Sequence, residues 1–338
     1  MSIAFITGIT GQDGYFLTKL LLVKGYKVFG FSRDYPVKTL NSLSNDLLKE
    51  VTQLKGSIEN PQEVIKALEL ARPNEIYHLA SQSHPGKSWQ AIEESLKING
   101  LGAVNLFEAV RQVCPTAKVH HASSAEIFGR SQAAILNEQT PMSPSSPYAA
   151  SKAYAHHLAS IYRASYGLFI SNGILFNHES ERRSLSFVTQ KVAYGAACAA
   201  LGIIDSFHTN EAGEPIVRAG KLALGNLDVS RDWGYAPDFV KAMWLMLQQS
   251  DPNDFVIGTG KAHSLRELCE IAYGCVDKHW QDYVYCDKRF KRPLETNVLI
   301  ADAGKAESLL GWRPSIDFRT MIMKMVRVQI EKLRTSQA

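Results

Sequence analysis

The chain has 338 residues, of which 45% are hydrophobic and 21% are charged, so it can bury the core of one large or two smaller domains. Its 37 basic and 33 acidic residues give a formal net charge of +4 and form no basic block of the kind that binds nucleic acid. Neither a charged leader nor a run of about 18 apolar residues occurs, so we expect a cytoplasmic protein with no nucleic-acid or membrane partner.

The cysteines indicate a reducing compartment. They are odd in number and have neither CxxC nor metal-ligand spacing: Cys114, Cys198, Cys269, Cys275 and Cys286. We therefore expect buried thiols and no metal site.

Short apolar runs alternate with longer amphipathic runs over the first 180 residues. In chain order they are IAFIT, YFLTKLLLVKG, KVFGF, PQEVIKALELA, EIYHLA, AVNLFEAVRQV and KVHHASS, followed by the helical SPYAASKAYAHHLASIYRASYG and the strand FISNGILF. Strands separated by helices require crossover connections. The pattern predicts an α/β fold with a doubly wound, Rossmann-type parallel sheet.

After about residue 180 the pattern becomes irregular. Residues 201–221, LGIIDSFHTNEAGEPIVRAGK, are polar and contain three glycines and one proline, so they predict a loop or hairpin excursion. Helical stretches near 236–249, 263–276, 301–310 and 317–333 follow. They predict a smaller, mixed α/β domain, with the ligand site in the cleft between the two domains.

The stretch FITGITGQDGYF places Gly8, Gly11 and Gly14 between the first strand and the first helix. Glycines at such spacing allow a tight turn, close approach to a pyrophosphate and close helix packing. A glycine turn without a ligand is the alternative, and the position in the first βα turn favours a dinucleotide. Arg33, at the end of the second strand, favours NADP over NAD, whereas Asp34 beside it suits NAD. A solvated strand-end charge is the other interpretation of Arg33.

Tyr148 and Lys152 are four residues apart on a predicted helix and so share one face. A neighbouring ammonium favours the phenolate, so we expect the pKa of Tyr148 to fall from about 10 towards neutrality. Tyr148 could then remove a hydroxyl proton while hydride leaves the same carbon.

Ser124 and Glu126 lie at the end of the strand that runs through KVHHASS. Ser124 would hydrogen-bond the same hydroxyl, and Glu126 can act as general base on a carbon made acidic by an adjacent ketone. Taken alone, Ser124 is more typical of a strand-terminal cap, and Glu126 is equally typical of a solvated loop charge.

These motifs resemble those of the extended short-chain dehydrogenase/reductases and, within that group, the GDP-mannose 4,6-dehydratase family. The matching stretches span nearly the whole chain, and NGILFNHES and GNLDVSRDWG are the most specific of them. The others are ITGITGQDG, EIYHLASQSH, SSAEIFG, SPYAASKAYA, FVTQK, DFVIGTG, RPLE and LGWRP.

The resemblance implies a lyase that dehydrates a nucleotide-diphosphate hexose, GDP-D-mannose, without net redox change. Hydride leaves C4 for a tightly bound NADP, with Tyr148 as base, Lys152 as its electrostatic support and Ser124 holding the 4-hydroxyl. Glu126 removes the C5 proton and assists loss of the 6-hydroxyl as water, and the hydride then returns to C6. The product would be a 4-keto-6-deoxy sugar nucleotide.

The resemblance also implies binding residues and domain limits. The NADP site would comprise Gly8, Thr10, Gly11, Gln12, Asp13, Gly14, Arg33, Leu79, Ser81, Gln82, Ser83, Tyr148, Lys152, His178 and Arg183. The nucleotide sugar would contact Ser83, Asn177, Lys191, Arg231, Arg292 and Glu295, since arginine suits bidentate phosphate contacts. Residues 1–180, with a returning strand and helix near 221–249, would bind NADP, and residues 181–338 would mainly bind the nucleotide sugar. A homodimer through the Tyr148 helix is expected, and a tetramer is possible.

The sequence departs from the family in several places. Ser124 stands where the family usually has threonine, Ala125 replaces a common serine, and Ser57 replaces an aspartate that contacts adenine. The excursion at 203–220 is also longer than in the family.

Other functions remain open. A nucleotide-sugar 4-epimerase or 4-keto reductase would not need Glu126, whose presence favours the dehydratase. A non-catalytic NADP-binding module is the remaining alternative.

Overall fold

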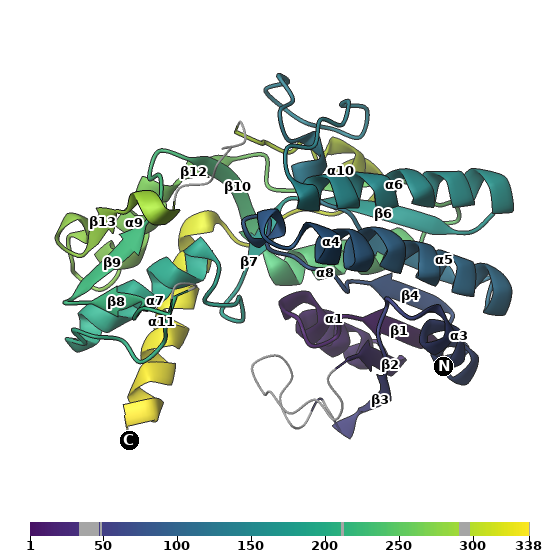
Figure 1. The fold of residues 1–338 in the computed structure, drawn as a ribbon, viewed down its shortest axis with the longest axis horizontal. Helices are drawn as coiled ribbons and strands as arrows, with labels where there is room; N and C mark the ends of the chain where they lie inside the picture. The colour runs from purple at the N-terminus through teal and green to yellow at the C-terminus, as the bar shows by residue number, and fades with distance from the viewer. Residues whose placement is uncertain (34–46, 48, 211–212, 291–297, 338) are drawn as a thin grey trace.

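The computed structural model describes residues 1–33, 47, 49–210, 213–290 and 298–337. At its centre lies a seven-stranded parallel sheet with the order β11-β6-β5-β4-β1-β2-β3 (Figure 1). Its strands in chain order are β1 (Ile3–Thr7), β2 (Lys27–Ser32), β3 (Val51–Lys55), β4 (Glu75–His78), β5 (Lys118–Ala122), β6 (Ile170–Leu175) and β11 (Phe255–Ile257). The strand order reverses between β1 and β4, which is where an open parallel sheet binds its ligand. The predicted doubly wound sheet is confirmed.

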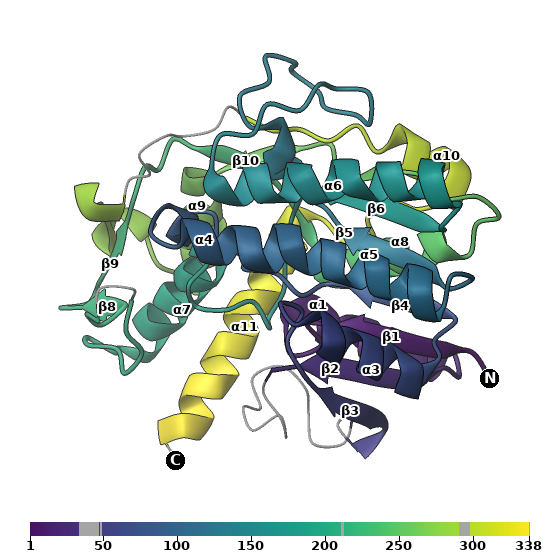
Figure 2. The same ribbon diagram turned by 45° about the vertical axis from the view of Figure 1, so that its right-hand side comes forward.

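Helices cover both faces of this sheet. Those around it are α1 (Gln12–Val23), α3 (Pro61–Ala71), α4 (Ile92–Ser95), α5 (Gly102–Val113), α6 (Pro147–Tyr166), α8 (Ala236–Leu247) and α10 (Gly304–Leu310). Alternate residues of β1 point to opposite faces: Ile6 packs in the core under α1 and α8, while Phe5 packs in the core under α3 and α5. Figure 2 shows α4 and α5 in one line along the second of these faces, with α6 beside them.

The long helix α6 begins and ends where its sequence indicates. The Ser146 hydroxyl accepts a hydrogen bond from the backbone nitrogen of Ala149, and Pro147 occupies the first helical turn. Gly167 ends the helix in the left-handed conformation, at φ 66°. These caps fix the start of α6 and hence the position of Tyr148 in its first turn.

A smaller part of the chain lies beside the carboxyl ends of the large sheet. It contains α7 (Val188–Leu201), α9 (Leu265–Gly274) and α11 (Phe318–Gln337). Two three-stranded sheets accompany them. One is formed by β7 (Asn177–Glu179), β10 (Ser230–Tyr235) and β12 (Ala262–Ser264), the other by β8 (Val217–Arg218), β9 (Lys221–Leu224) and β13 (Val284–Cys286). Parallel and antiparallel pairs both occur, so the predicted mixed α/β architecture is confirmed.

One detail of the predicted organisation is wrong. The strand expected to return to the large sheet near residue 221 is β9, which pairs with β8 and β13 instead. The returning strand is β11, which pairs with β6, and the returning helix is α8, as expected. The domain limits themselves stay a prediction.

The polar excursion at 201–221 contains a short hairpin-like contact. An isolated bridge joins Thr209 to Pro215, and residues 211–212 between them lie outside the described part of the chain. Over the described residues, no helix is both long and apolar enough to cross a membrane.

Candidate active site

A cavity of about 590 Å³ opens at the carboxyl ends of the large sheet, against β7, β9, β10 and α7 of the smaller part. Many residues predicted for the site line it: Asp13, Leu79, Ser81, Ser83, Ser124, Glu126, Tyr148, Lys152, Asn177, His178, Arg183, Lys191 and Arg231. The cavity lining does not include Gly8, Thr10, Gly11, Gln12, Gly14, Arg33 or Gln82. Arg292 and Glu295 lie outside the described residues, as does Asp34.

The chain after β5 carries two of the candidate catalytic groups. Ser124 is extended, and its hydroxyl accepts a hydrogen bond from the backbone nitrogen of Glu126 at 3.3 Å. It therefore caps a short 3-10 helix, η3 (Ala125–Phe128), as one interpretation of the sequence had it. Glu126 is 9% exposed, which excludes the alternative of a solvated loop charge.

Tyr148 and Lys152 lie on the buried face of α6, one helical turn apart. The Lys152 Nζ donates a hydrogen bond to the Ala122 carbonyl at 2.9 Å, which joins the helix to the end of β5. Burial lowers the pKa of Lys152 to about 8.

The expected direction of the Tyr148 pKa is wrong for this structure. Burial raises the pKa of Tyr148 to about 12, a hydrogen bond from Ser124 lowers it, and the Glu126 charge raises it further. Desolvation of the phenolate thus outweighs its favourable contacts. The phenol is the resting form.

The three glycines of the first turn have different surroundings. Gly8 has φ +71°, and a Cβ there would lie 2.7 Å from the backbone nitrogen of Ala80. A Cβ on Gly14 would lie 2.3 Å from the carbonyl oxygen of Ile9. A Cβ on Gly11 would meet only the Gly8 oxygen, at 3.4 Å, and Gly11 forms the N-cap of α1. The turn therefore needs two glycines for its own packing and leaves space at a helix N-terminus, which fits a pyrophosphate.

A buried ion pair ties this turn to β7. The Nε2 of His178 lies 2.9 Å from Oδ2 of Asp13, and its Nδ1 lies 2.7 Å from the carbonyl oxygen of Phe176. Both partners are acceptors, so the ring donates from both nitrogens and is protonated. Burial alone would lower the pKa of His178, but the Asp13 carboxylate outweighs it and raises that pKa. Burial would likewise raise the pKa of Asp13, and His178 holds it below its ordinary value.

Gln12 strengthens the same connection. Its amide donates to the carbonyl oxygen of His178 at 3.1 Å and accepts from the Ser180 hydroxyl at 2.7 Å. Sequence reasoning placed Gln12, Asp13 and His178 at the cofactor but missed that they bind one another. No spacing signal exists for a contact across 165 residues.

Asn99 is a site-forming residue that the sequence did not indicate. It lies in a π-helical segment, Leu96–Leu101, and is 1% exposed. Its amide oxygen accepts from the Ser81 hydroxyl and from the backbone nitrogen of Gln82, each at 2.9 Å. Its amide nitrogen donates to the Ser151 hydroxyl at 3.1 Å, so Asn99 connects the loop after β4 with α6.

Arg33 lies away from the cavity. Its side chain is 65% exposed and lies 3.8 Å from the Glu59 carboxylate. An exposed ion pair with this separation contributes little to the free energy of folding. Ser57, at the position where the family has aspartate, donates its backbone nitrogen to Glu63 at 2.7 Å.

Several cationic side chains line the cavity. Arg231 is 7% exposed, Lys191 lies 5.7 Å from the ring centre of Phe290, and Arg183 pairs with Glu179 at 3.1 Å. Arg289 and Phe290 also line the cavity and were not predicted. Such a set suits a diphosphate.

The described residues contain no group of three or more His, Cys, Asp or Glu side chains that could hold a metal ion. All five cysteines are free thiols, and of these Cys286 is exposed rather than buried as expected.

Comparisons with known proteins point to one family. A family model described as GDP-mannose 4,6 dehydratase matches residues 5–325. The chain is 40% identical over 340 residues to GDP-mannose 4,6 dehydratase 1 of Arabidopsis thaliana, covering 97% of this chain and 90% of that protein. It is 35% identical over 361 residues to the GDP-mannose 4,6 dehydratase of Homo sapiens, covering 99% and 93%.

Solved structures agree on the fold. The UDP-glucose 4-epimerase of Thermus thermophilus, in complex with NAD, has a TM-score of 0.81 at 24% identity, with 97% of this chain and 98% of that chain covered. The dTDP-glucose 4,6-dehydratase of Bacillus anthracis, also with NAD, has a TM-score of 0.80 at 20% identity, covering 99% and 98%.

Proposed function

Because the chain belongs to the GDP-mannose 4,6-dehydratase family, we propose that its cavity removes one water from GDP-D-mannose and yields GDP-4-keto-6-deoxy-D-mannose. The chain is an enzyme of the lyase class, and its substrate is a nucleotide sugar. The observation that carries the proposal is the burial of Glu126 beside Tyr148 in one cavity. An epimerase or reductase needs proton transfer at C4, whereas dehydration needs a second acid/base group for C5 and C6.

NADP fits the glycine turn on structural grounds. The space beside Gly11 at the N-terminus of α1 would receive the pyrophosphate, and Tyr148 and Lys152 would face the nicotinamide end. The nicotinamide, when bound, supplies the hydride acceptor for C4 and the hydride donor for C6. The preference for NADP over NAD rests on Arg33 and stays a proposal.

Tyr148 and Ser124 serve the 4-hydroxyl. The Ser124 hydroxyl holds it, and the Tyr148 oxygen takes its proton as the C4 ketone forms. Only the phenolate can accept this proton, and because the phenolate is scarce when the pKa is about 12, a nearby positive charge must stabilise it before the transfer. The Lys152 ammonium, held in place by the Ala122 carbonyl, performs this role.

Glu126 serves C5 and C6. The ketone at C4 acidifies the C5 proton, which the Glu126 carboxylate removes. Glu126 then returns this proton to the 6-hydroxyl, which leaves as water. The proton that Tyr148 took from the 4-hydroxyl balances the one that C5 regains when C6 receives the hydride. Since Ala125 beside it carries no proton donor, Glu126 supplies both the base and the acid.

Lys191, Arg231 and Arg289 would bind the diphosphate, because all three line the end of the cavity formed by α7, β10 and the segment after β13. The substrate contacts expected of Arg292 and Glu295 remain predictions.

We also propose a homodimer through α6, with a tetramer as the alternative. The exposed apolar side chains Tyr154, Ile161 and Tyr166 of α6 and Leu96 and Leu101 of the neighbouring helical segment support it. A cytoplasmic location is supported by the five free thiols.

The test is to incubate the purified protein with GDP-, dTDP-, UDP- and CDP-hexoses and to follow the products by mass spectrometry. Loss of one water from GDP-mannose alone is the expected result. An unchanged product mass would favour an epimerase, and net accumulation of NADPH would contradict the redox-neutral cycle.

A Glu126→Gln variant separates the steps. It should still exchange hydride at C4 but form no dehydrated product, whereas the control Glu94→Gln, on the exposed side of α4, should behave like wild type. Full dehydration by Glu126→Gln would refute the role of this carboxylate.

A further inference from the structure

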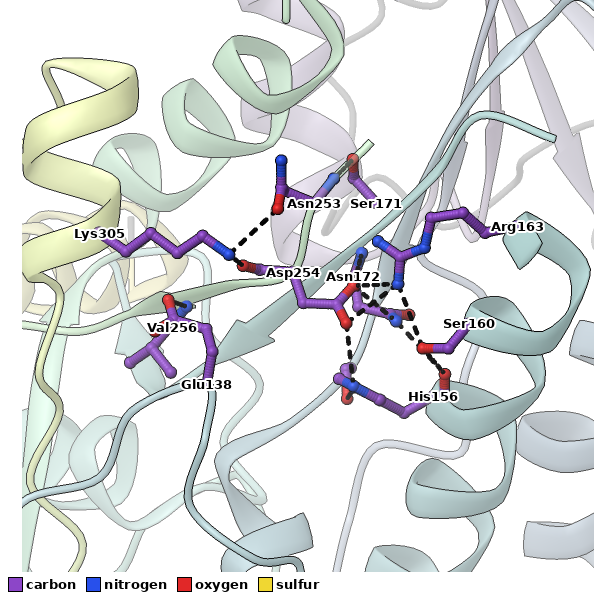
Figure 3. Close-up of polar contacts among 11 residues, drawn as sticks. Glu138, His156, Ser160, Arg163, Ser171, Asn172, Asn253, Asp254, Val256 and Lys305 are labelled. Atoms are coloured by element: carbon purple, nitrogen blue, oxygen red, sulfur yellow. Dashed lines mark hydrogen bonds and ion pairs between the residues drawn. The ribbon is translucent and has the colours of Figure 1, made fainter. Parts of the chain in front are cut away.

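Beneath the cavity a set of polar side chains, buried at His156 and Asn172 and half-buried at Asp254 and Arg163, connects α6 with the strands on either side. Figure 3 shows Asp254, just before β11, at the centre of this set, with Arg163 and His156 reaching it from α6 and Asn172 from β6. The Asp254 carboxylate accepts from Arg163 at 2.9 Å and from the Asn172 amide at 3.0 Å. Its other oxygen lies 3.5 Å from Nε2 of His156. Asp254 is ionised, since its pKa is lowered to about 2 by His156 and Arg163 against the effect of burial.

His156 extends this set to the wall of the cavity. Its Nδ1 lies 3.1 Å from the hydroxyl oxygen of Ser123, and its side chain is 6% exposed. The Nε2 of His156 faces Oδ2 of Asp254 at 3.5 Å, and its Nδ1 shares a hydrogen bond with the Ser123 hydroxyl. With a carboxylate on one side and a hydroxyl on the other, the ring is held in one orientation between Asp254 and Ser123.

Ser123 occupies a sensitive position in the chain. It lines the cavity and lies between Ala122 and Ser124. The carbonyl oxygen of Ala122 accepts a hydrogen bond from Lys152. Ser124 in turn caps the short helix that carries Glu126. A shift of the segment 122–124 would therefore move the contacts of Lys152, Ser124 and Glu126 together.

The helix α6 carries His156 on the same face as the catalytic pair. His156 lies one turn after Lys152 and two turns after Tyr148 on the same face of α6. Two hydrogen bonds thus join this face to residues 122 and 123 at the end of β5, one with Lys152 at 2.9 Å and one with His156 at 3.1 Å. They set the distance between Tyr148 on the helix and Glu126 on the loop.

We propose that Ser123, His156 and Asp254 form a positioning relay that holds the segment 122–124 in register with α6 and so aligns the groups acting on the sugar. His156 touches neither the sugar nor the cofactor in this role, and it is a positioning residue. The inference rests on the proposed dehydration. Because a displacement of about 1 Å can cost about 100-fold in rate, losing the His156–Ser123 contact should lower kcat by about 10- to 100-fold and leave KM nearly unchanged.

Two substitutions of His156 separate its two contacts. Asparagine places its amide where Nδ1 stands and can keep the bond to Ser123, whereas glutamine reaches the position of Nε2 and loses that bond. His156→Asn should retain kcat within about threefold, and His156→Gln should show the full loss. His157→Phe, which alters the exposed neighbouring histidine, is the matched control and should equal wild type.

Ser123 provides an independent check if His156 variants fold poorly. Ser123→Ala should lower kcat as His156→Gln does, Ser123→Thr should restore it, and the double variant Ser123→Ala/His156→Gln should lose no more than either single variant. Three results would overturn the relay. The first is an equal kcat in all variants, and the second is a loss of kcat in the double variant equal to the product of the two single losses. The third is a rise in KM that accounts for the whole loss of activity.

Amide hydrogen exchange gives a readout that does not depend on turnover. His156→Gln should speed exchange in residues 122–129, and His157→Phe should not. Unchanged exchange there would overturn the relay even if the protein dehydrates GDP-mannose. Faster exchange in a protein that forms no dehydrated product would support the relay and contradict the proposed function instead.

Discussion

Replacing Asp13 with asparagine removes one charge of the buried pair that ties the cofactor turn to β7. The pKa of His178 is raised above 6.5 and that of Asp13 is lowered below 3.8. The raised pKa of His178 contributes stability that is complete below pH 6.5 and is lost as the pH rises through the folded pKa of the ring. The lowered pKa of Asp13 contributes stability that is lost as the pH falls below 3.8. The pair therefore stabilises the protein most between these values.

The side chains of Asp13 and His178 are 21% and 12% exposed. Breaking this pair should therefore lower the free energy of unfolding by most of the amount that a fully buried pair would lose. We expect Asp13→Asn to lower the free energy of unfolding by about 3 kcal/mol near pH 6. For a chain of this length that corresponds to a fall in Tm of about 4 °C. At pH 9, farther above the ordinary histidine value of 6.5, a smaller share of His178 is protonated in wild type, and the difference in Tm should be smaller than at pH 6.

Calorimetry of wild type and Asp13→Asn at these two pH values measures both differences. Asp282→Asn, in an exposed turn, serves as the control and should show no pH-dependent difference. A fall in Tm for Asp13→Asn that is equal at both pH values would refute the ion pair as its cause.

Other predictions concern the cofactor turn and the catalytic pair. Gly11→Ala should fold with stability within about 1 kcal/mol of wild type yet bind NADP at least about tenfold more weakly in a fluorescence titration, because its Cβ occupies the space left for the pyrophosphate. Gly14→Ala should fail to fold, since its Cβ meets backbone atoms of Ile9, and soluble expression measures this. The dehydration rate should fall as the pH rises through about 8, where Lys152 loses its proton, and Lys152→Arg should move this fall to higher pH. Tyr148→Phe should abolish turnover measured by mass spectrometry, and a near-full rate would contradict its role as base.

Much of the fold could be predicted because local pattern and tertiary structure agree. The apolar runs of β1, β2, β4, β5 and β6 are buried strands, and the helix expected to open in SPYAASK begins in that motif, at Pro147. β11 was missed because three residues, Phe255–Ile257, carry too little pattern to separate a sheet strand from a loop.

The sequence could predict which residues line the candidate site, but it could not predict their pKa values or their contacts with one another. Spacing on a helix brings Tyr148 and Lys152 to one face whatever surrounds them. The pKa of Tyr148 depends on how deeply the rest of the chain buries it, and the sequence does not contain that information locally. The same holds for Asn99 and for the Asp13–His178 pair, whose contacts join distant segments.

The chain crosses several times between the two parts of the molecule, and this limits which fragments of it can fold alone. After β6 the chain leaves the large sheet, returns as α8 and β11, leaves for α9 and returns as α10 before ending in α11. A fragment ending near residue 180 would lack β11, exposing the edge of β6, and would lose Phe239, Met243 and Trp312 from its core. Residues 1–180 are then not an autonomous folding unit, and we expect the cofactor turn and the sugar pocket to be lost together when the chain unfolds.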